Sequence, residues 1–176
     1  MTTTNANGIA TFPSSFGAVR YTHLELRVDK QETFESLQDA VTLYQRTRMH
    51  KAAQETFWVL GFGSVLNIAT IFEVNRGMQA YVDLHMPTLF GGLLVAGCER
   101  FWLAHNHPSN DVQPSEDDVT TTIAVMKASN VMNMHFEDHL ILAPNGQWFS
   151  LEKAGILKPD PKSPYVTSKR AAALKR

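Results

Sequence analysis

The chain has a single cysteine, Cys98, among its 176 residues. It therefore cannot form an internal disulfide bond, and this cysteine content is typical of proteins in a reducing compartment. Long apolar runs are also missing, because the longest, TLFGGLLVAG at 88–97, is too short to cross a bilayer. The N-terminus lacks a basic segment followed by an apolar one, so no secretory signal is predicted. We expect a cytoplasmic protein that does not act in a membrane.

An excess of charge of either sign is missing too, since the formal net charge is −1. The charge is unevenly distributed, however. Residues 158–176 hold six basic residues and one acidic residue, a net charge of +5, which leaves 10 basic and 16 acidic residues, a net charge of −6, in the preceding chain. An acidic body is a poor non-specific ligand for a phosphate backbone. The basic tail is interpreted as a solvated, disordered segment, with contact to nucleic acid or another anionic partner as the alternative.

The remaining composition, 44% hydrophobic and 19% charged, is that of an ordinary globular protein. The length is sufficient for one domain with a real core and short for two. Residues 1–18 are small and polar, so we expect them to be flexible. The predicted organisation is a flexible segment at 1–18, one domain at 19–157 and a basic tail at 158–176.

Hydrophobic periodicity predicts helices interleaved with strands along the domain. Asn145 and Gly146 form a strong hairpin-turn signal between the last two strands. This order predicts an α/β fold with a mixed β-sheet flanked by helices. The predicted strands lie at 20–28, 56–62, 65–74, 100–105 and in a hairpin at 139–151; the predicted helices lie at 33–49, at 87–98, from Ser115 onward with Val119, Ile123 and Met126 on one face, and near 151–156.

Two histidines stand one residue apart at the end of the predicted strand 100–105, in the sequence HNHPS. Side chains two residues apart on a strand point to the same side, so His105 and His107 should reach one point in space. Pro108 favours an extended conformation for His107 and ends the strand. Asp118 follows eleven residues after His107, in the first turn of the next predicted helix, where its carboxylate can complete the set.

Two imidazole nitrogens and one carboxylate oxygen suit Zn²⁺, and three protein ligands leave one position open, as in catalytic zinc sites. The same residues have a second interpretation. The spacing of Ser115 and Asp118 is typical of a capping box, with Ser115 as N-cap and Asp118 at the third helical position. Ser115 can serve both roles, by capping the helix and by presenting its hydroxyl to a water or an oxyanion at the metal.

The pattern H-x-H, seven residues, then S-x-x-D resembles the JAMM (MPN-plus) metalloprotease signature. Its form here, HNHPS followed by PS-x-x-D, is similar to the RadC family of JAB domains. The similarity extends to QETFWVLGF (54–62), NRGM (75–78), EDHLIL (137–142) and WFSLEKAGIL (148–157), and covers residues from about 34 to 157. It implies a JAB/MPN (cytidine-deaminase-like) fold. Asn110 stands where the family has a glycine, and asparagine also tolerates a left-handed turn.

The resemblance further implies a glutamate that is hydrogen-bonded to the water at the metal. By the match of ETFWVL this residue is Glu55. Zn²⁺ lowers the pKa of the water, and the carboxylate takes its proton and passes it to the leaving group. Glu73 in FEVNRG is the rival for this role, and Glu99 is a weaker third candidate.

Other titratable residues receive structural interpretations. His135 and His139 are four apart, but a strand is predicted to begin near His139, so helical ligand geometry is not expected. Asp138 and His139 also match a pair typical of the family, which leaves open that His139 fixes the tautomer of a ligand. Cys98 lies in an apolar helix and is interpreted as a core residue.

The resemblance implies a zinc-dependent JAMM-type hydrolase, a metallopeptidase or isopeptidase that acts on a peptide or a ubiquitin-like protein tail. We expect the strand before His105 and the strand from Phe57 to frame its groove. One alternative is a DNA-repair-associated protein that acts on or near nucleic acid, with the basic tail as docking element. A non-catalytic MPN-like binding module is a third alternative, disfavoured because the metal ligands are kept. The substrate and the oligomeric state are left open.

Overall fold

The computed structural model describes residues 3–4, 10–11, 36–63, 68–77 and 84–157. The predicted strand at 20–28, most of the segment 1–18 and the basic tail 158–176 lie outside these residues. The helices are α1 (Leu37–Arg46), α2 (Met86–Val95) and α3 (Glu116–Val131), with a short 3-10 helix, η1 (Met49–Lys51). The strands are β1 (Thr3–Thr4), β2 (Ala10–Thr11), β3 (Thr56–Phe62), β4 (Ile68–Arg76), β5 (Arg100–Asn106), β6 (His135–Leu142) and β7 (Trp148–Ser150).

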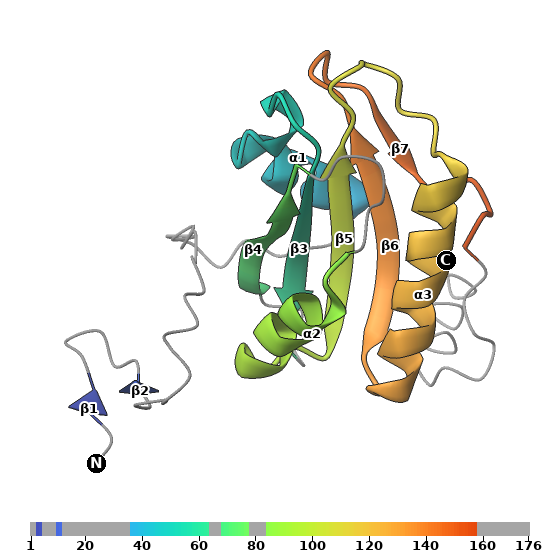
Figure 1. Cartoon of the computed structure of the whole chain (residues 1–176). Coiled ribbons are helices and arrows are strands. Elements are labelled where there is room, and N and C mark those ends of the chain that lie inside the picture. Colours follow the sequence, from blue (N-terminus) through green and yellow to red (C-terminus); the bar gives the residue numbers. More distant parts are fainter. Residues whose placement is uncertain (1–2, 5–9, 12–35, 64–67, 78–83, 158–176) are drawn as a thin grey trace.

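Five strands form one mixed sheet in the order β4-β3-β5-β6-β7, while β1 and β2 pair with each other (Figure 1). β3 pairs antiparallel with both β4 and β5. β6 runs parallel to β5 and antiparallel to β7. A parallel pair requires a crossover connection, and α3 supplies it. The predicted α/β fold, a mixed sheet flanked by helices, is confirmed.

Helices cover both faces of this sheet, with α2 and α3 on one side and α1 on the other (Figure 1). On the first face, Leu93 of α2 and Val125 of α3 belong to a buried cluster with Val59 of β3 and Leu103 of β5. On the second face, α1 contributes to a separate cluster with the alternate residues of the same strands. The central strands are therefore buried on both sides, and any polar residue on them needs a specific partner.

Gly92 allows α2 to lie close against β4. A Cβ atom at this position would come within 2.3 Å of Cζ of Phe72. Phe72 is itself buried, so its ring has little room to move aside. The glycine in the middle of an apolar helix is therefore explained by packing rather than by a break in the helix.

The buried face of α3 differs from the sequence prediction. The helix does begin after Ser115, but Ile123 of the expected apolar face is exposed. Three of the four residues that α3 buries are polar, and two of them, Asp118 and Thr122, contact histidines of the sheet from the first two turns of the helix. The buried residues of α3 are Asp118, Thr122, Val125 and Ser129.

The segment after β7 also differs from the prediction. Residues 151–155 form hydrogen-bonded turns instead of a short helix, and Gly155 has a φ of +75°. The buried carboxylate of Asp138 anchors this segment, since it accepts hydrogen bonds from the hydroxyl of Ser150 at 2.6 Å and from the backbone N–H of Glu152 at 2.8 Å. Among the described residues, no helix is both long enough and apolar enough to span a membrane.

Candidate metal centre

The two histidines of the HNH sequence leave the same side of the end of β5. His105 is fully buried and His107 is partly buried. The ring of His105 is stacked on that of Phe57 in the neighbouring strand, with centroids 4.8 Å apart and an interplanar angle of 16°. The Nε2 atoms of His105 and His107 lie 2.9 Å apart. The predicted convergence of the two imidazoles is present.

Asp118 reaches the same point from the first turn of α3 and divides its two oxygens between two tasks. Its Oδ2 accepts hydrogen bonds from the backbone N–H and the hydroxyl of Ser115, at 2.8 and 2.7 Å. Its Oδ1 lies 3.1 Å from Nε2 of His105. The capping box and the ligand set were rival interpretations of this sequence, and the geometry accommodates both at once. Ser115 is the N-cap, as predicted.

Among the described residues, His105, His107 and Asp118 are the group of three that could hold a metal ion. The two Nε2 atoms lie 2.9 Å apart, and Nε2 of His105 lies 3.1 Å from Oδ1 of Asp118. Nε2 of His107 lies 3.4 Å from the other oxygen, Oδ2, which also accepts from Ser115. Tetrahedral Zn²⁺, with bonds of about 2.0 Å, separates neighbouring ligand atoms by about 3.3 Å. The three residues therefore fit a zinc ion with little rearrangement.

The hydrogen bond at the far side of the His107 ring supports the same conclusion. Its Nδ1 lies 2.7 Å from the backbone carbonyl oxygen of Asp111, and a carbonyl can only accept, so Nδ1 carries a proton. In the neutral ring, Nε2 is then free of a proton, and its lone pair is available to a metal held between the three residues. The loop that provides this carbonyl also contains Asn110, whose φ of +66° is the left-handed turn expected there.

The two histidines strongly affect the pKa of Asp118, and Asp118 affects that of His107. Burial alone would raise the pKa of Asp118, but its hydrogen bonds with His105 and His107 hold that pKa well below the usual range. Burial lowers the pKa of His107, yet the hydrogen bonds to Asp118 and Asp111 and the charges of Asp118 and Glu55 together raise it. A permanent carboxylate beside two imidazoles creates a demand for positive charge, which a proton or a metal cation can meet.

Glu55 lies just before β3 and is exposed. The β3–β5 ladder pairs Phe57 with His105, so the same register continued by two residues places Glu55 opposite His107. The charge of Glu55 contributes to the raised pKa of His107, in agreement with that position. Its backbone carbonyl accepts the N–H of Gly77 at 2.8 Å, which ties the segment to the end of β4.

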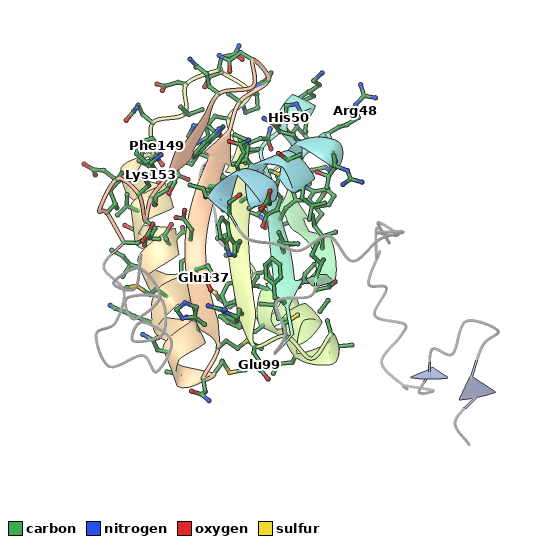
Figure 2. All side chains as sticks on the ribbon, turned by 180° about the vertical axis from the view of Figure 1, so that it is seen from behind. Arg48, His50, Glu99, Glu137, Phe149 and Lys153 are labelled. Carbon is green, nitrogen blue, oxygen red and sulfur yellow. The ribbon has the colours of Figure 1, made fainter. Side chains whose placement is uncertain are left out.

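The two rival glutamates lie elsewhere. Glu73 pairs in register with Trp58, whose side chain packs in the cluster on the α1 face, and its carboxylate binds the guanidinium of Arg76. Glu99 immediately precedes β5, at the opposite end of that strand from the histidines. Figure 2 shows Glu99 at the end of the molecule away from Arg48 and His50. Neither carboxylate faces the three ligands.

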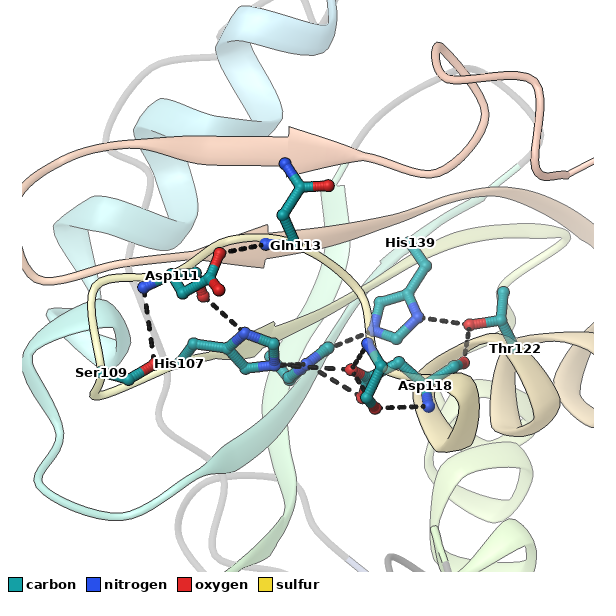
Figure 3. A network of polar contacts seen from close by, with 9 residues as sticks. His107, Ser109, Asp111, Gln113, Asp118, Thr122 and His139 are labelled. Carbon is teal, nitrogen blue, oxygen red and sulfur yellow. Dashed lines mark hydrogen bonds and ion pairs between the residues drawn. The ribbon is translucent and has the colours of Figure 1, made fainter.

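Sequence reasoning favoured a structural role for His139, and the structure brings it into direct contact with the site. Nε2 of His139 lies 2.8 Å from Nδ1 of His105, and its Nδ1 lies 2.6 Å from the hydroxyl of Thr122 (Figure 3). Burial lowers the pKa of His139 well below its usual value, so the ring is neutral. Thr122 was missed altogether, although it lies four residues after Asp118 and therefore on the same helical face. His135 lies near Glu137 instead.

Asn106, between the two histidines, was also missed. Its side chain is fully buried on the opposite face of β5 and donates to the carbonyls of Ala52 and Gln54, both at 3.2 Å. A polar residue within an apolar strand was the available signal. Cys98 is buried, and burial raises the pKa of its thiol to about 11, in line with the core role expected of it.

One expectation about the surroundings of the site was wrong. The strand before His105 and the strand from Phe57 are β5 and β3, which pair directly with each other from Phe57–His105 to Phe62–Arg100. No groove separates them, so an extended ligand cannot lie between these two strands. The outer edges of this five-stranded sheet are those of β4 and β7.

Comparisons with known proteins agree with this geometry. The family model of the RadC-like JAB domain matches residues 34–156. A UPF0758 protein of Porphyromonas gingivalis is 30% identical over 138 residues, which cover 76% of this chain and 61% of the relative. UPF0758 proteins of Staphylococcus epidermidis (29% identity, 73% and 58% coverage) and Clostridium kluyveri (44% identity, 69% and 53% coverage) are also similar.

The chain thus spans between about half and three fifths of the length of these curated relatives. The matched range includes all three candidate ligands as well as Glu55, His139 and Thr122. Because the family model covers well over half of the sequence, the chain belongs to the RadC-like JAB domain family.

Proposed function

We propose that this chain is a zinc-dependent hydrolase that cleaves peptide or isopeptide bonds. The observation that carries the proposal is the set formed by His105, His107 and Asp118. Their ligand atoms are spaced for Zn²⁺, and three protein ligands leave one position for a water or a substrate oxygen. Zn²⁺ bound there would act as a Lewis acid that polarises a carbonyl group and lowers the pKa of a water molecule.

Glu55 is the proposed general base. It lies on the side of β3 that faces His107, it is exposed to solvent, and none of the rival glutamates shares that position. As a carboxylate it accepts a proton from the attacking water and then donates it to the leaving amine. Ser115 holds Asp118 through two hydrogen bonds, one of them from its hydroxyl, and it is itself an exposed residue.

An extended peptide or the tail of a ubiquitin-like protein is the proposed substrate. The ligands lie where β5 ends and α3 begins, and His107 remains partly exposed there. The body of the chain carries a net charge of −6, which disfavours a nucleic acid at this position. Since β3 and β5 are paired, main-chain contacts to an extended substrate would have to come from the outer edge of the sheet or from the loops around the ligands.

The test uses the zinc-loaded full chain, incubated in parallel with a peptide library, ubiquitin-like fusions, and single- and double-stranded DNA. We expect chelator-sensitive cleavage of a peptide or isopeptide bond that Glu55→Gln abolishes and that removal of 158–176 leaves unchanged. Glu73→Gln is the matched control and should keep its activity. Metal-dependent cleavage of DNA without cleavage of any peptide bond would replace this proposal by a nuclease function.

A further inference from the structure

A series of hydrogen bonds lies behind the candidate ligands, and one contact is enough to deduce which atom donates in each of them. The hydroxyl oxygen of Thr122 lies 2.5 Å from the backbone carbonyl oxygen of Asp118. Two oxygens at this distance need a proton between them, and only the hydroxyl has one. Thr122 therefore donates to Asp118, and its oxygen can only accept from any other neighbour.

The second neighbour of that oxygen is His139. Nδ1 of His139 lies 2.6 Å from the Thr122 hydroxyl, so Nδ1 is the protonated nitrogen of this ring. In the neutral imidazole the other nitrogen, Nε2, then bears a lone pair. His139 is fully buried, so water does not offer either nitrogen an alternative partner.

The lone pair of His139 is directed at His105. Nε2 of His139 lies 2.8 Å from Nδ1 of His105, which must donate and therefore carries the proton of that ring. Nε2 of His105, the atom that faces His107 and Asp118, is then the free nitrogen. The dashed lines of Figure 3 follow the first two contacts, from Asp118 to Thr122 and from Thr122 to His139.

We propose that Thr122 and His139 are positioning residues that set the tautomer of His105 and so keep its Nε2 available to bind a metal. The chain of contacts begins at the backbone of Asp118 and ends at the ring beside its carboxylate, so it forms a closed loop through two of the three ligands. The inference rests on the metal site of the proposed function but not on the hydrolytic reaction. It names a task for a buried histidine and a buried hydroxyl that bind no metal themselves.

Without the hydroxyl of Thr122, nothing should fix which nitrogen of His139 carries the proton. Valine has nearly the same shape as threonine but cannot accept the proton of His139 Nδ1. The ring of His139 can then keep its proton on Nε2 and donate to His105, which places the proton of His105 on its own Nε2, where it blocks the metal. Loss of such a partner behind a ligand typically lowers metal affinity by about 10–100-fold.

The experiment measures Zn²⁺ and Co²⁺ affinity of the full chain by competition with a chromophoric chelator, together with the visible spectrum of the Co²⁺ form. Thr122→Val should lower the metal affinity about 10–100-fold, whereas Thr122→Ser, which keeps the hydroxyl, should have the affinity of the wild type. Ser129→Ala is the matched control: it removes another buried hydroxyl of α3, one that donates to the carbonyl of Met126 within the same helix, and it should leave metal affinity unchanged.

His139→Gln tests whether Thr122 acts on metal affinity through His139. The side-chain carbonyl of glutamine can accept the proton of His105 Nδ1 without any help from Thr122. The effect of Thr122→Val on metal affinity should therefore be smaller in the His139→Gln background than in the wild type. Equal effects in both backgrounds would mean that the two residues act separately, and the proposal would be wrong.

Nitrogen NMR of the metal-free protein at pH 8 gives a readout that needs neither metal nor substrate. In the wild type, Nδ1 of His105 should be protonated toward His139, and Thr122→Val should lose this proton from Nδ1. A His105 ring without a proton on Nδ1 in the wild type would overturn the proposal, as would an equal loss of metal affinity in Thr122→Val and Ser129→Ala. Because these results do not depend on turnover, they stand apart from a failure to find hydrolysis.

Discussion

The side-chain carbonyl of Asn106 accepts two hydrogen bonds from Thr56, one from its backbone N–H at 2.9 Å and one from its hydroxyl at 2.8 Å. Asn106 lies between His105 and His107 at the end of β5, and Thr56 is the residue after Glu55. The strand that carries the ligands is thus attached to the segment that carries the proposed base, through a contact on the opposite face of the sheet. We infer that the hydrogen bonds between Asn106 and Thr56 help to fix the distance between Glu55 and the candidate ligands.

Asn106→Asp should destabilise the protein. The new carboxylate can still accept from Thr56 but has no N–H groups for the carbonyls of Ala52 and Gln54, which it also repels. Each buried polar group left without a partner costs about 1–3 kcal/mol, so we expect a loss of about 3 kcal/mol in the free energy of unfolding, measured by urea denaturation. Asn145→Asp, in the exposed hairpin turn where Asp-Gly is also favourable, should change stability little. Equal effects would contradict the role given to Asn106.

Glu55→Gln should separate the base from the ligands. The amide cannot take a proton from water, so turnover should fall by about 10²–10⁴ while the zinc content and the melting temperature remain those of the wild type. Glu73→Gln, which removes only the pairing with Arg76, should keep near-normal turnover. If Glu73→Gln were the inactive variant and Glu55→Gln the active one, the base would have to be reassigned to Glu73.

The purified chain, prepared without chelators, should contain about one Zn²⁺ per molecule. His107→Ala should lose most of it, because a ligand is removed at an otherwise intact site. Metal that binds only the folded state also stabilises it, so chelation should lower the melting temperature of the wild type and leave that of His107→Ala unchanged. Elemental analysis and thermal denaturation with and without chelator test both statements, and a full metal content in His107→Ala would contradict the ligand assignment.

Asp138 should make the protein less stable as pH rises. Burial raises the pKa of this carboxyl from 3.8 to about 6, despite the hydrogen bonds from Ser150, Glu152 and His139 that favour its ionised form. The folded state therefore holds the proton more tightly than the unfolded state. Its contribution is greatest at or below pH 4, declines between pH 4 and 6, and is constant above. Urea denaturation across this range should show that Asp138→Asn lacks this part of the decline, and parallel curves for both proteins would contradict it.

Local patterns were sufficient for most of the elements and for bringing together the three residues of the candidate metal centre. His105 and His107 could be predicted because strand alternation is a property of neighbouring residues, and Asp118 because a capping box fixes the start of a helix. The strand predicted at 20–28 lies outside the described residues, and turns replace the helix predicted at 151–156. The other predicted strands and helices appear at nearly the predicted positions. The mixed sheet followed from the order of these elements, and it is confirmed.

What sequence could not provide was the identity of partners far apart along the chain. His139 meets His105 only because β6 pairs in parallel with β5, and no local pattern specifies that register. For α3, the apolar residues Val119 and Ile123 predicted one buried face. The helix buries a different face, because Asp118 and Thr122 contact histidines on the sheet. The expected groove failed for a related reason, since the pairing of β3 with β5 is a tertiary fact.

The buried face of α3 has a consequence for local unfolding. A helix usually docks through an apolar stripe, whose contribution hardly responds to pH or ions, but the first two turns of α3 are held by Asp118 and Thr122 through contacts to imidazole rings. Amide exchange in these turns should therefore follow the occupancy of the site, rapid when the rings lack a cation and slow when they have one. The exchange rates of backbone amides in α3, which do not bind the metal themselves, should then show whether a metal is present.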